Sequence, residues 1–525
     1  MIRVFNTLSR TKEDFVPVRE NKVGMYLCGP TVYKPSHIGH MVGPVIFDTI
    51  KKYLVYSGYD VTFVVNITDV DDKLIQESNR RNVPMPEIAR EMTEDYWSNL
   101  AAMGVDSIDK FPKATEYMDG IIRFTQDLID KGYAYESNGD VYFKVEKFDG
   151  YGKLSNRTLD QMLGEGGGTA ERKSSSFDFA LWKSAKPGEP SWDSPWGKGR
   201  PGWHIECSVM SCSLLGETFD IHGGGLDLQF PHHENEIAQS EARHGKPMAK
   251  YWMHNGLMQA SSEIGKLGGR KTHAAASAPK EGDIASQEGG KISKSKGASA
   301  FRDMLKTTSP ERIRFFLLST HYRRPIDYSL ERLAEVGKGL ETFYRFFQRF
   351  ERVTKSDFYA IPFPKTRVEG DAFVSQTAAL QCNLGQAICA ERQKFLEAMD
   401  DDFNTGKGIG ILFDMLRVLN RFVEEQKLET NPTDDGIKQL TAASSLFREV
   451  TAVLGLFVKK IEEPKTETAD NSLTDSLMAI LIELRQAAKK NKDYATADKI
   501  RDALTPLGIK IEDRPTGPVW SKVTQ

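Results

Sequence analysis

The segments VGMYLCGP (residues 23–30) and VTFVVNI (residues 61–67) decide the fold, with HIGHMVGPVIFDTIKKYL (residues 37–54) between them. The two outer segments are short apolar runs, typical of strands buried on both faces. The middle segment has the apolar spacing of a helix. Strand, helix and strand at this spacing predict a βαβ unit, in which the two strands are parallel.

A second unit with parallel-sheet character follows later in the chain. Residues 203–216 (WHIECSVMSCSLLG) and 232–245 (HHENEIAQSEARHG) have helical spacing, and residues 218–224 (TFDIHGG) between them predict a strand. The sequence therefore predicts an α/β fold built on a split doubly wound, Rossmann-like parallel sheet. The segment between the halves predicts an insertion with a helix, a hairpin that turns at Asn138-Gly139, and a loop to about residue 200.

The chain after the second half changes character. Residues 259–290 are small, polar and aperiodic, which predicts a flexible insertion. Beyond them the pattern is helical: Pro310 follows Thr308 and Ser309 as at a helix start, and Ser329 fits the N-cap of a long amphipathic helix. We expect an α-helical bundle to about residue 460, then a linker and a small C-terminal domain.

Composition limits the class of protein. The chain has 525 residues, too many for one hydrophobic core, and a formal net charge of -3, so nucleic-acid binding would depend on local Lys and Arg clusters. Five cysteines do not indicate a disulfide framework. The N-terminal residues MIRVFNTLSR lack a signal-peptide pattern, and no apolar run approaches the roughly 20 residues of a membrane span. We expect a cytoplasmic protein with no membrane partner.

Two motifs suit phosphate binding. His37 and His40 are spaced i, i+3 at a predicted helix start, where a triphosphate would be stabilised, and Gly39 would let a flat base approach the backbone. The segment KISKSKG, residues 291–297, offers Lys and Ser donors on a flexible arm. Taken singly, each motif is also compatible with a solvated surface segment. In this order, after the two halves of a split nucleotide fold, they resemble the signature of class I aminoacyl-tRNA synthetases.

A third group of residues suits a metal ion. Cys28 ends the first strand, Cys207 lies on a predicted helix with Trp203 on the same face, and His232 and Glu236 are spaced i, i+4. Two thiolates, an imidazole and a carboxylate suit zinc. The alternative is two core cysteines and a surface His/Glu pair. His233 and Glu234 could also replace their neighbours, and Cys212 is nearby.

The chain resembles the cysteinyl-tRNA synthetases over nearly its whole length. The match includes the segments MYLCGP, GWHIEC, FDIHGGGLDL, HHENE and STHYRRPIDYS. The resemblance implies that Cys28, Cys207, His232 and Glu236 hold one Zn²⁺, with a coordination position left open for the substrate thiolate. The chain departs from the family in the Ile of KISKS, where Met is commoner, and in the longer polar insertion ahead of it.

The resemblance also implies the reaction and its partners. ATP, with Mg²⁺, and L-cysteine would form cysteinyl-adenylate, and tRNA(Cys) would then accept the cysteinyl group. His37, His40 and Lys294 would stabilise charge on the phosphates, while Gly39, Asp227, Lys291 and Lys294 would bind the nucleotide. Thr68, Trp203 and His222 would surround the cysteine. For Asp227, a helix N-cap is the other interpretation, and the two are compatible.

The predicted division of the chain follows from the same resemblance. The catalytic domain would consist of residues 1–115 and 201–258, with the connective insertion, residues 116–200, between them. The flexible polar insertion, residues 259–290, and the lysine-loop and stem-contact region, residues 291–328, would follow. The tRNA would bind to the helical bundle, residues 329–460, and to the anticodon-binding unit, residues 472–525. In this last unit, Arg485, Lys489, Lys490, Lys492, Lys499 and Arg501 predict a phosphate-contacting surface, and Trp520 a platform for an unpaired base.

Two other functions fit parts of the pattern. A ligase that joins cysteine to an amino-sugar, of the mycothiol type, shares the catalytic domain but lacks the terminal RNA-binding unit. A non-catalytic, synthetase-like RNA-binding paralogue would usually have lost the zinc or lysine-loop residues, which are all present here.

Overall fold

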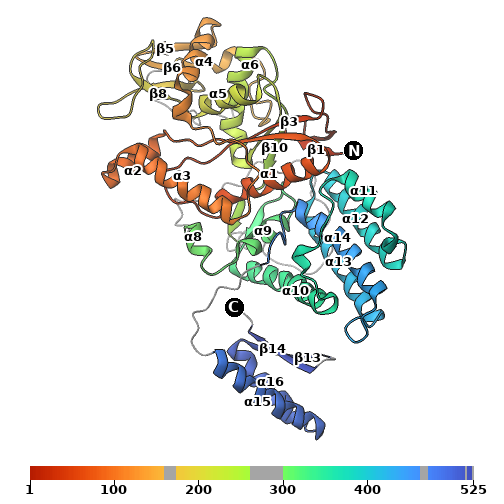
Figure 1. Ribbon diagram of the computed structural model, residues 1–525. Helices are drawn as coiled ribbons and strands as arrows, with labels where there is room; N and C mark the ends of the chain where they lie inside the picture. Colours follow the sequence, from red (N-terminus) through yellow and green to blue (C-terminus); the bar gives the residue numbers. More distant parts are fainter. Residues whose placement is uncertain (159–172, 261–299, 461–470, 515–516, 523–525) are drawn as a thin grey trace, which may run out of the picture.

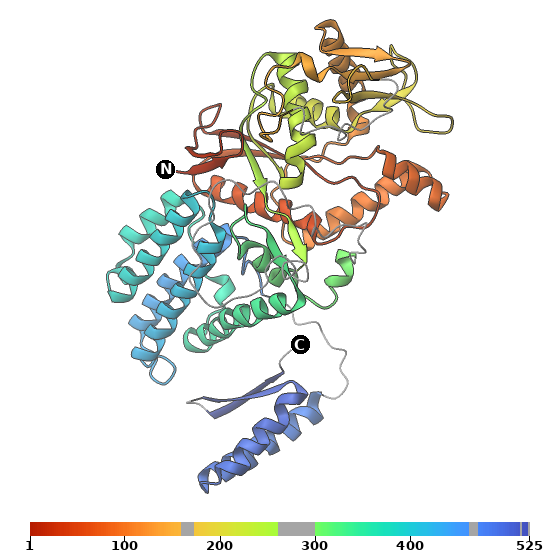
Figure 2. The ribbon, with the colours of Figure 1, turned by 180° about the vertical axis from the view of Figure 1, so that it is seen from behind.

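A four-stranded parallel sheet is the centre of the computed structural model, which describes residues 1–158, 173–260, 300–460, 471–514 and 517–522 (Figures 1 and 2). Its order is β10-β9-β3-β4. The strands are β3 (Lys22–Leu27), β4 (Asp60–Val65), β9 (Phe219–Gly225) and β10 (Ala249–Asn255). The chain order reverses between β3 and β9, and ligands of such sheets bind outside the carboxyl ends of the strands at this switch point.

Helices cover both faces of the sheet. Gly43 of α1 (Gly39–Tyr56) lies against Leu27, whereas Gly24 lies against Leu215 of α5 (Trp203–Leu215). Residues 24 and 27 face opposite sides of β3, because side chains alternate along a strand. The predicted split doubly wound fold is therefore confirmed. The other elements of this part are β1 (Arg3–Asn6), β2 (Thr11–Asp14), α2 (Asp72–Arg81), α3 (Met85–Ala102) and α6 (Glu234–His244).

The insertion contains more sheet than the sequence predicted. After α4 (Met118–Asp130), the hairpin of β5 (Ala134–Ser137) and β6 (Asp140–Phe143) turns at Asn138 and Gly139, both with positive φ, as expected. The predicted loop, however, contains β7 (Phe179–Ser184) and β8 (Gly199–Pro201), which extend an antiparallel sheet β5-β6-β7-β8. Residues Phe179–Trp182 are all buried, so a short apolar run inside a polar segment forms the missed strand.

The C-terminal half is helical, with two short parallel strands near its start. Ser309 and Ser329 cap α9 and α10 as predicted, each hydroxyl accepting from a backbone N–H three residues on. The elements are β11 (Met258–Ala260), α8 (Phe301–Met304), α9 (Pro310–Leu318), β12 (Ile326–Tyr328), α10 (Leu330–Thr354), α11 (Arg367–Gln376), α12 (Asn383–Asp400), α13 (Thr405–Glu425) and α14 (Asp434–Val453). Figure 1 shows α11 to α14 side by side to the right and lower right of α1, with α10 beneath it.

Buried polar contacts join the helical half of the chain to α1, which packs on the parallel sheet. Arg314 of α9 donates to Asp48 of α1 at 2.5 Å, and also to the carbonyl oxygens of Leu454, Met103 and Gly104. At the C-terminal end of α1, Glu449 of α14 accepts from the Tyr56 hydroxyl at 2.6 Å and from Arg392 of α12 at 2.7 Å. The two halves of the chain therefore meet along α1.

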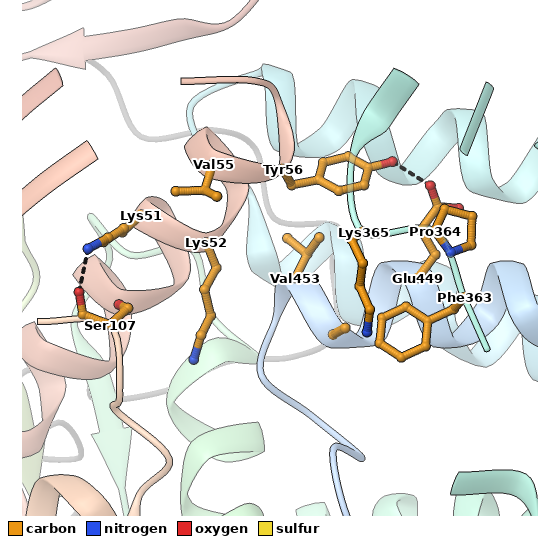
Figure 3. A pocket seen from close by; sticks show the side chains of 11 residues that line it. Lys51, Lys52, Val55, Tyr56, Ser107, Phe363, Pro364, Lys365, Glu449 and Val453 are labelled. Atoms are coloured by element: carbon orange, nitrogen blue, oxygen red, sulfur yellow. Dashed lines mark hydrogen bonds between the residues drawn. The ribbon is translucent and has the colours of Figure 1, made fainter. Parts of the chain in front are cut away.

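A cavity of about 330 Å³ lies at this junction, at the C-terminal end of α1 (Figure 3). Val55, Phe363 and Val453 supply apolar walls, while Lys52 and Lys365 extend along its sides. Because α1 has 18 residues, this end is roughly 25 Å from its first residue, Gly39. The cavity is therefore distant from the carboxyl ends of the strands, where doubly wound parallel sheets bind their ligands.

The last unit has a separate small core. It consists of α15 (Asn471–Lys490), α16 (Tyr494–Leu504), β13 (Ile509–Arg514) and β14 (Gly517–Lys522). Arg485, predicted to contact phosphates, is 3% exposed and donates to Asp513 through both Nη atoms, so it is not available for that contact. Trp520 is partly buried and packs against the core of Met478, Leu504 and Ile511, and its role as a platform for an unpaired base stays a prediction. In the described ranges, no helix is both long and apolar enough to cross a membrane.

Candidate metal centre and active site

Cys28 stands at the switch point of the sheet. Its N–H donates to the Gly223 carbonyl of β9, so the chain continues alongside β9 after β3 ends. Gly29 then passes so close to β4 that an added Cβ would lie 1.8 Å from the Asn66 carbonyl oxygen. Only glycine fits there, and its N–H donates to the Asn66 side chain at 2.8 Å.

Four predicted metal ligands come together at this point. The sulfur of Cys28 lies 3.7 Å from that of Cys207 and 3.5 Å from Glu236 Oε1, and His232 Nε2 lies 3.0 Å from the same oxygen. One ligand atom from each of the four lies within 4.8 Å of the others. Tetrahedral zinc with bonds of about 2.0–2.3 Å requires ligand separations of roughly 3.3–3.8 Å. The residues therefore fit a zinc ion.

The segment that carries His232 differs from the prediction. Residues Gln229–His233 form an irregular turn in which Phe230 has non-helical angles, and α6 begins only at Glu234. The residue before a proline avoids helical angles, and Pro231 follows Phe230. The i, i+4 relation of His232 to Glu236 nevertheless survives, as their 3.0 Å separation shows.

A second set of four residues overlaps the first. Cys28 and Glu236 also lie within 4.8 Å of His222 and His233. His233 Nε2 is 3.3 Å from the Cys28 sulfur, and the fully buried His222 has its Nε2 2.8 Å from Glu236 Oε2. Glu234, the other competitor, instead accepts from the backbone N–H groups of Leu154 and Ser155.

The outer hydrogen bonds favour the first set. His232 Nδ1 lies 3.0 Å from His204 Nδ1, which leaves Nε2 directed at the cluster. A metal-bound histidine usually has its other ring nitrogen held in this way. His222 Nδ1, in contrast, is buried and has no hydrogen-bond partner among the described residues. Contacts among the described residues therefore give His232 the better support as a ligand.

The protonation states also suit a metal. Burial lowers the pKa of His232 and His233 well below the ordinary value, so both imidazoles are neutral, the form that binds metals. Burial, followed by the hydrogen bond with Cys207, raises the pKa of Cys28 well above its usual range. A bound cation reverses this effect, because a coordinating thiol loses its proton.

The residues predicted around the substrate occupy the same sheet edge. Thr68 is buried and its hydroxyl donates to Glu206 Oε2 at 3.0 Å. Trp203 is 40% exposed, and its ring centroid lies 4.3 Å from that of His232. His222 belongs to β9 and contacts Glu236. A partly exposed indole beside a buried cluster is suited to cover a small ligand.

The predicted phosphate residues are placed only in part. His37 and His40 stack with their ring centroids 3.9 Å apart, so the shared face expected from their spacing is present. Gly39 begins α1, and Asp227 lies in the short helix Leu226–Leu228, whose N-cap is Gly225 rather than Asp227. Lys291 and Lys294 lie outside the described residues, as does most of the predicted flexible insertion, residues 259–290, because the structure does not describe residues 261–299.

Sequence reasoning missed several hydrogen-bond partners of this site. His254 Nε2 lies 2.8 Å from His233 Nδ1, and the other ring nitrogen of His254 lies 2.9 Å from the Thr7 hydroxyl. Glu206 and His204, on either side of Ile205, contact Thr68 and His232. Both residues lie in the segment WHIEC, next to the proposed ligand Cys207, and this position could have indicated that they contact the site.

Comparison with known proteins gives the family. A family model for the class I (C) tRNA synthetase catalytic domain matches residues 14–266, and one for the DALR domain matches residues 394–458. Curated proteins named cysteine–tRNA ligase from Geobacillus thermodenitrificans and Syntrophotalea carbinolica are 42% and 44% identical, over 99% of both chains in each pair. The chain belongs to the cysteine–tRNA ligase family.

Solved structures agree at the level of the fold. Mycobacterium tuberculosis methionyl-tRNA synthetase bound by methionyl-adenylate superposes with a TM-score of 0.54, covering 82% of this chain and 90% of that chain. Its sequence identity is 13%, so it supports the class I synthetase fold and carries no information on individual residues here.

Proposed function

We propose that the protein attaches L-cysteine to tRNA(Cys), using ATP to form cysteinyl-adenylate before the cysteinyl group passes to the tRNA. The observation that carries this proposal is the cluster of Cys28, Cys207, His232 and Glu236 at the switch point of the sheet. Membership of the cysteine–tRNA ligase family supports the same reaction. We also propose that the reaction takes place in the cytoplasm.

The proposed cofactor is one Zn²⁺, held by those four side chains. When bound, zinc supplies a ligand position that favours the thiolate of cysteine over the hydroxyl of serine. A purely apolar pocket separates such close analogues by only about 10²-fold. With four protein ligands, the substrate would enter as a fifth, and zinc can become five-coordinate.

The chain's own residues would bind and orient the reactants. Thr68, Trp203 and His222 would surround the cysteine, and Gly39, Asp227 and Lys291 would bind the nucleotide. His37, His40 and Lys294 would stabilise negative charge on the phosphates of ATP. Mg²⁺ would enter the site bound to ATP. The substrate carboxylate attacks the α-phosphorus and pyrophosphate leaves, so no protein nucleophile is required.

The C-terminal half would bind the tRNA. The DALR match falls within the predicted helical bundle, residues 329–460, and supports this assignment. The remaining predicted divisions of the chain are part of the same proposal. The amino-sugar ligase is less well supported, because the relatives named cysteine–tRNA ligase align over 99% of this chain, including its terminal unit.

Metal content and cysteine activation test the proposal together. We expect about one zinc per chain, reduced in Cys207→Ser and His232→Asn but retained in His233→Asn and in the control Cys212→Ser. Loss of zinc in His233→Asn with retention in His232→Asn would instead select the overlapping set. Wild-type protein should catalyse cysteine-dependent ATP–pyrophosphate exchange, with serine a poor competitor. Absence of both zinc and exchange would refute the proposed function.

A further inference from the structure

Ser36, the residue before His37, has both backbone polar groups bound by distant segments. Its N–H donates to Asp95 Oδ2 at 2.8 Å, and its carbonyl accepts from the Phe301 N–H at 2.7 Å. Asp95 belongs to α3, and Phe301 is the buried first residue of α8. These two hydrogen bonds on one residue fix both the position and the direction of the chain as it enters the turn of residues 37–40, which carries His37 and His40.

The turn itself has its own internal contacts. The His37 N–H donates to His40 Nδ1 at 3.1 Å, and the Gly39 N–H donates to His37 Nδ1 at 3.1 Å. Together with the ring stacking, these bonds orient the two imidazoles relative to each other. Where the pair points relative to the sheet depends on how the chain enters the turn at Ser36 and leaves it in α1.

We propose that Asp95 is a positioning residue for adenylate formation. Its carboxylate holds the Ser36 amide and thereby directs His37 and His40 toward the phosphates of ATP. Asn99, one turn further along α3, donates to the same oxygen at 3.1 Å and keeps the carboxylate in place. The inference rests on the proposed function, since it requires the two histidines to contact ATP.

Exchange kinetics of three variants test the role. Asp95→Ala should lower kcat for ATP–pyrophosphate exchange by on the order of 100-fold, because misplacement by about 1 Å can cost that much, with KM for cysteine nearly unchanged. Asp95→Asn retains an oxygen acceptor and should recover most of the rate. Glu94→Ala, at the exposed neighbouring position of α3, is the matched control and should match wild type.

A double variant separates positioning from general damage. In a His40→Ala background, Asp95→Ala should cause little further loss, because both changes act through the same group. If the losses of rate in the two single variants add in the double variant, the positioning role of Asp95 is refuted. An unchanged rate in Asp95→Ala beside an active wild type refutes it too, and in both cases the proposed function still stands. Inactive wild type would overturn the proposed function and this inference with it. Should Asp95→Ala not fold, Asn99→Ala must show a smaller loss of the same kind.

Discussion

Replacing Arg314 by methionine tests what holds the helical bundle to the catalytic sheet. Arg314 is 1% exposed and pairs with Asp48, which is fully buried. Breaking a buried pair from one side costs about 3–5 kcal/mol. Lys52 and Ser107 also contact Asp48, at 2.8 and 2.6 Å, and the substitution removes neither of them, so we expect the lower end, about 3 kcal/mol.

Urea unfolding followed by tryptophan fluorescence measures this loss. For a slope of about 3 kcal/mol per M, the midpoint should fall by about 1 M in Arg314→Met. The exposed Arg345→Met of α10 is the control and should change stability by less than about 0.5 kcal/mol. A shift in Arg314→Met no larger than the control's would refute the reasoning.

The pH dependence of the same contact has a defined sign. Burial alone would raise the pKa of Asp48, but Arg314 and Lys52 lower it below the ordinary value. A carboxyl whose pKa is lowered by folding stabilises the protein above its unfolded pKa of about 3.9 and loses that contribution as pH falls. The difference in free energy of unfolding between wild type and Arg314→Met should therefore persist at pH 7 and become smaller below about pH 4.

Three further predictions concern the active site and the tRNA. Lys294→Ala should slow adenylate formation by about 10²-fold or more in single-turnover assays with little change in cysteine affinity; an effect confined to KM for cysteine would contradict its role. Gly29→Ala should lower zinc content, because its Cβ would displace the strand end that carries Cys28, and normal zinc content would show that the backbone adapts. Deletion of residues 472–525 should spare ATP–pyrophosphate exchange but weaken tRNA charging, whereas full charging would exclude an anticodon role.

Much of the fold followed from local patterns. The strands β3 and β4 lie in short apolar runs of the sequence, and such runs are recognisable because both faces of a parallel strand are buried. The run Phe179–Trp182 has similar burial but is short and surrounded by polar residues, so it was not recognised. Its strand depends on pairing with β6, a long-range contact that local spacing does not encode.

The sequence predicted that the four proposed ligands would lie close together, as they do, but it predicted less of their surroundings. Spacing brought His232 and Glu236 to one face, and strand ends brought Cys28 to the switch point. Spacing could not distinguish His232 from His233, because that choice depends on the turn before α6 and on partners such as His204 and His254. Likewise, the buried pair of Arg485 and Asp513 joins a helix to a strand, so the charge pattern of the helix alone was misleading.

The distance along the chain between the cluster residues has a consequence for synthesis. Cys28 and Cys207 are separated by 179 residues, and Cys28 and Glu236 by 208. At about 5–20 residues per second, Glu236 leaves the ribosome roughly 10–40 s after Cys28. During that interval β3 can pair with β4, but its other edge has no partner until β9 is made. The nascent chain therefore carries an unpaired strand edge beside the Cys28 thiol until residue 225 emerges, and an unpaired edge can pair with another chain.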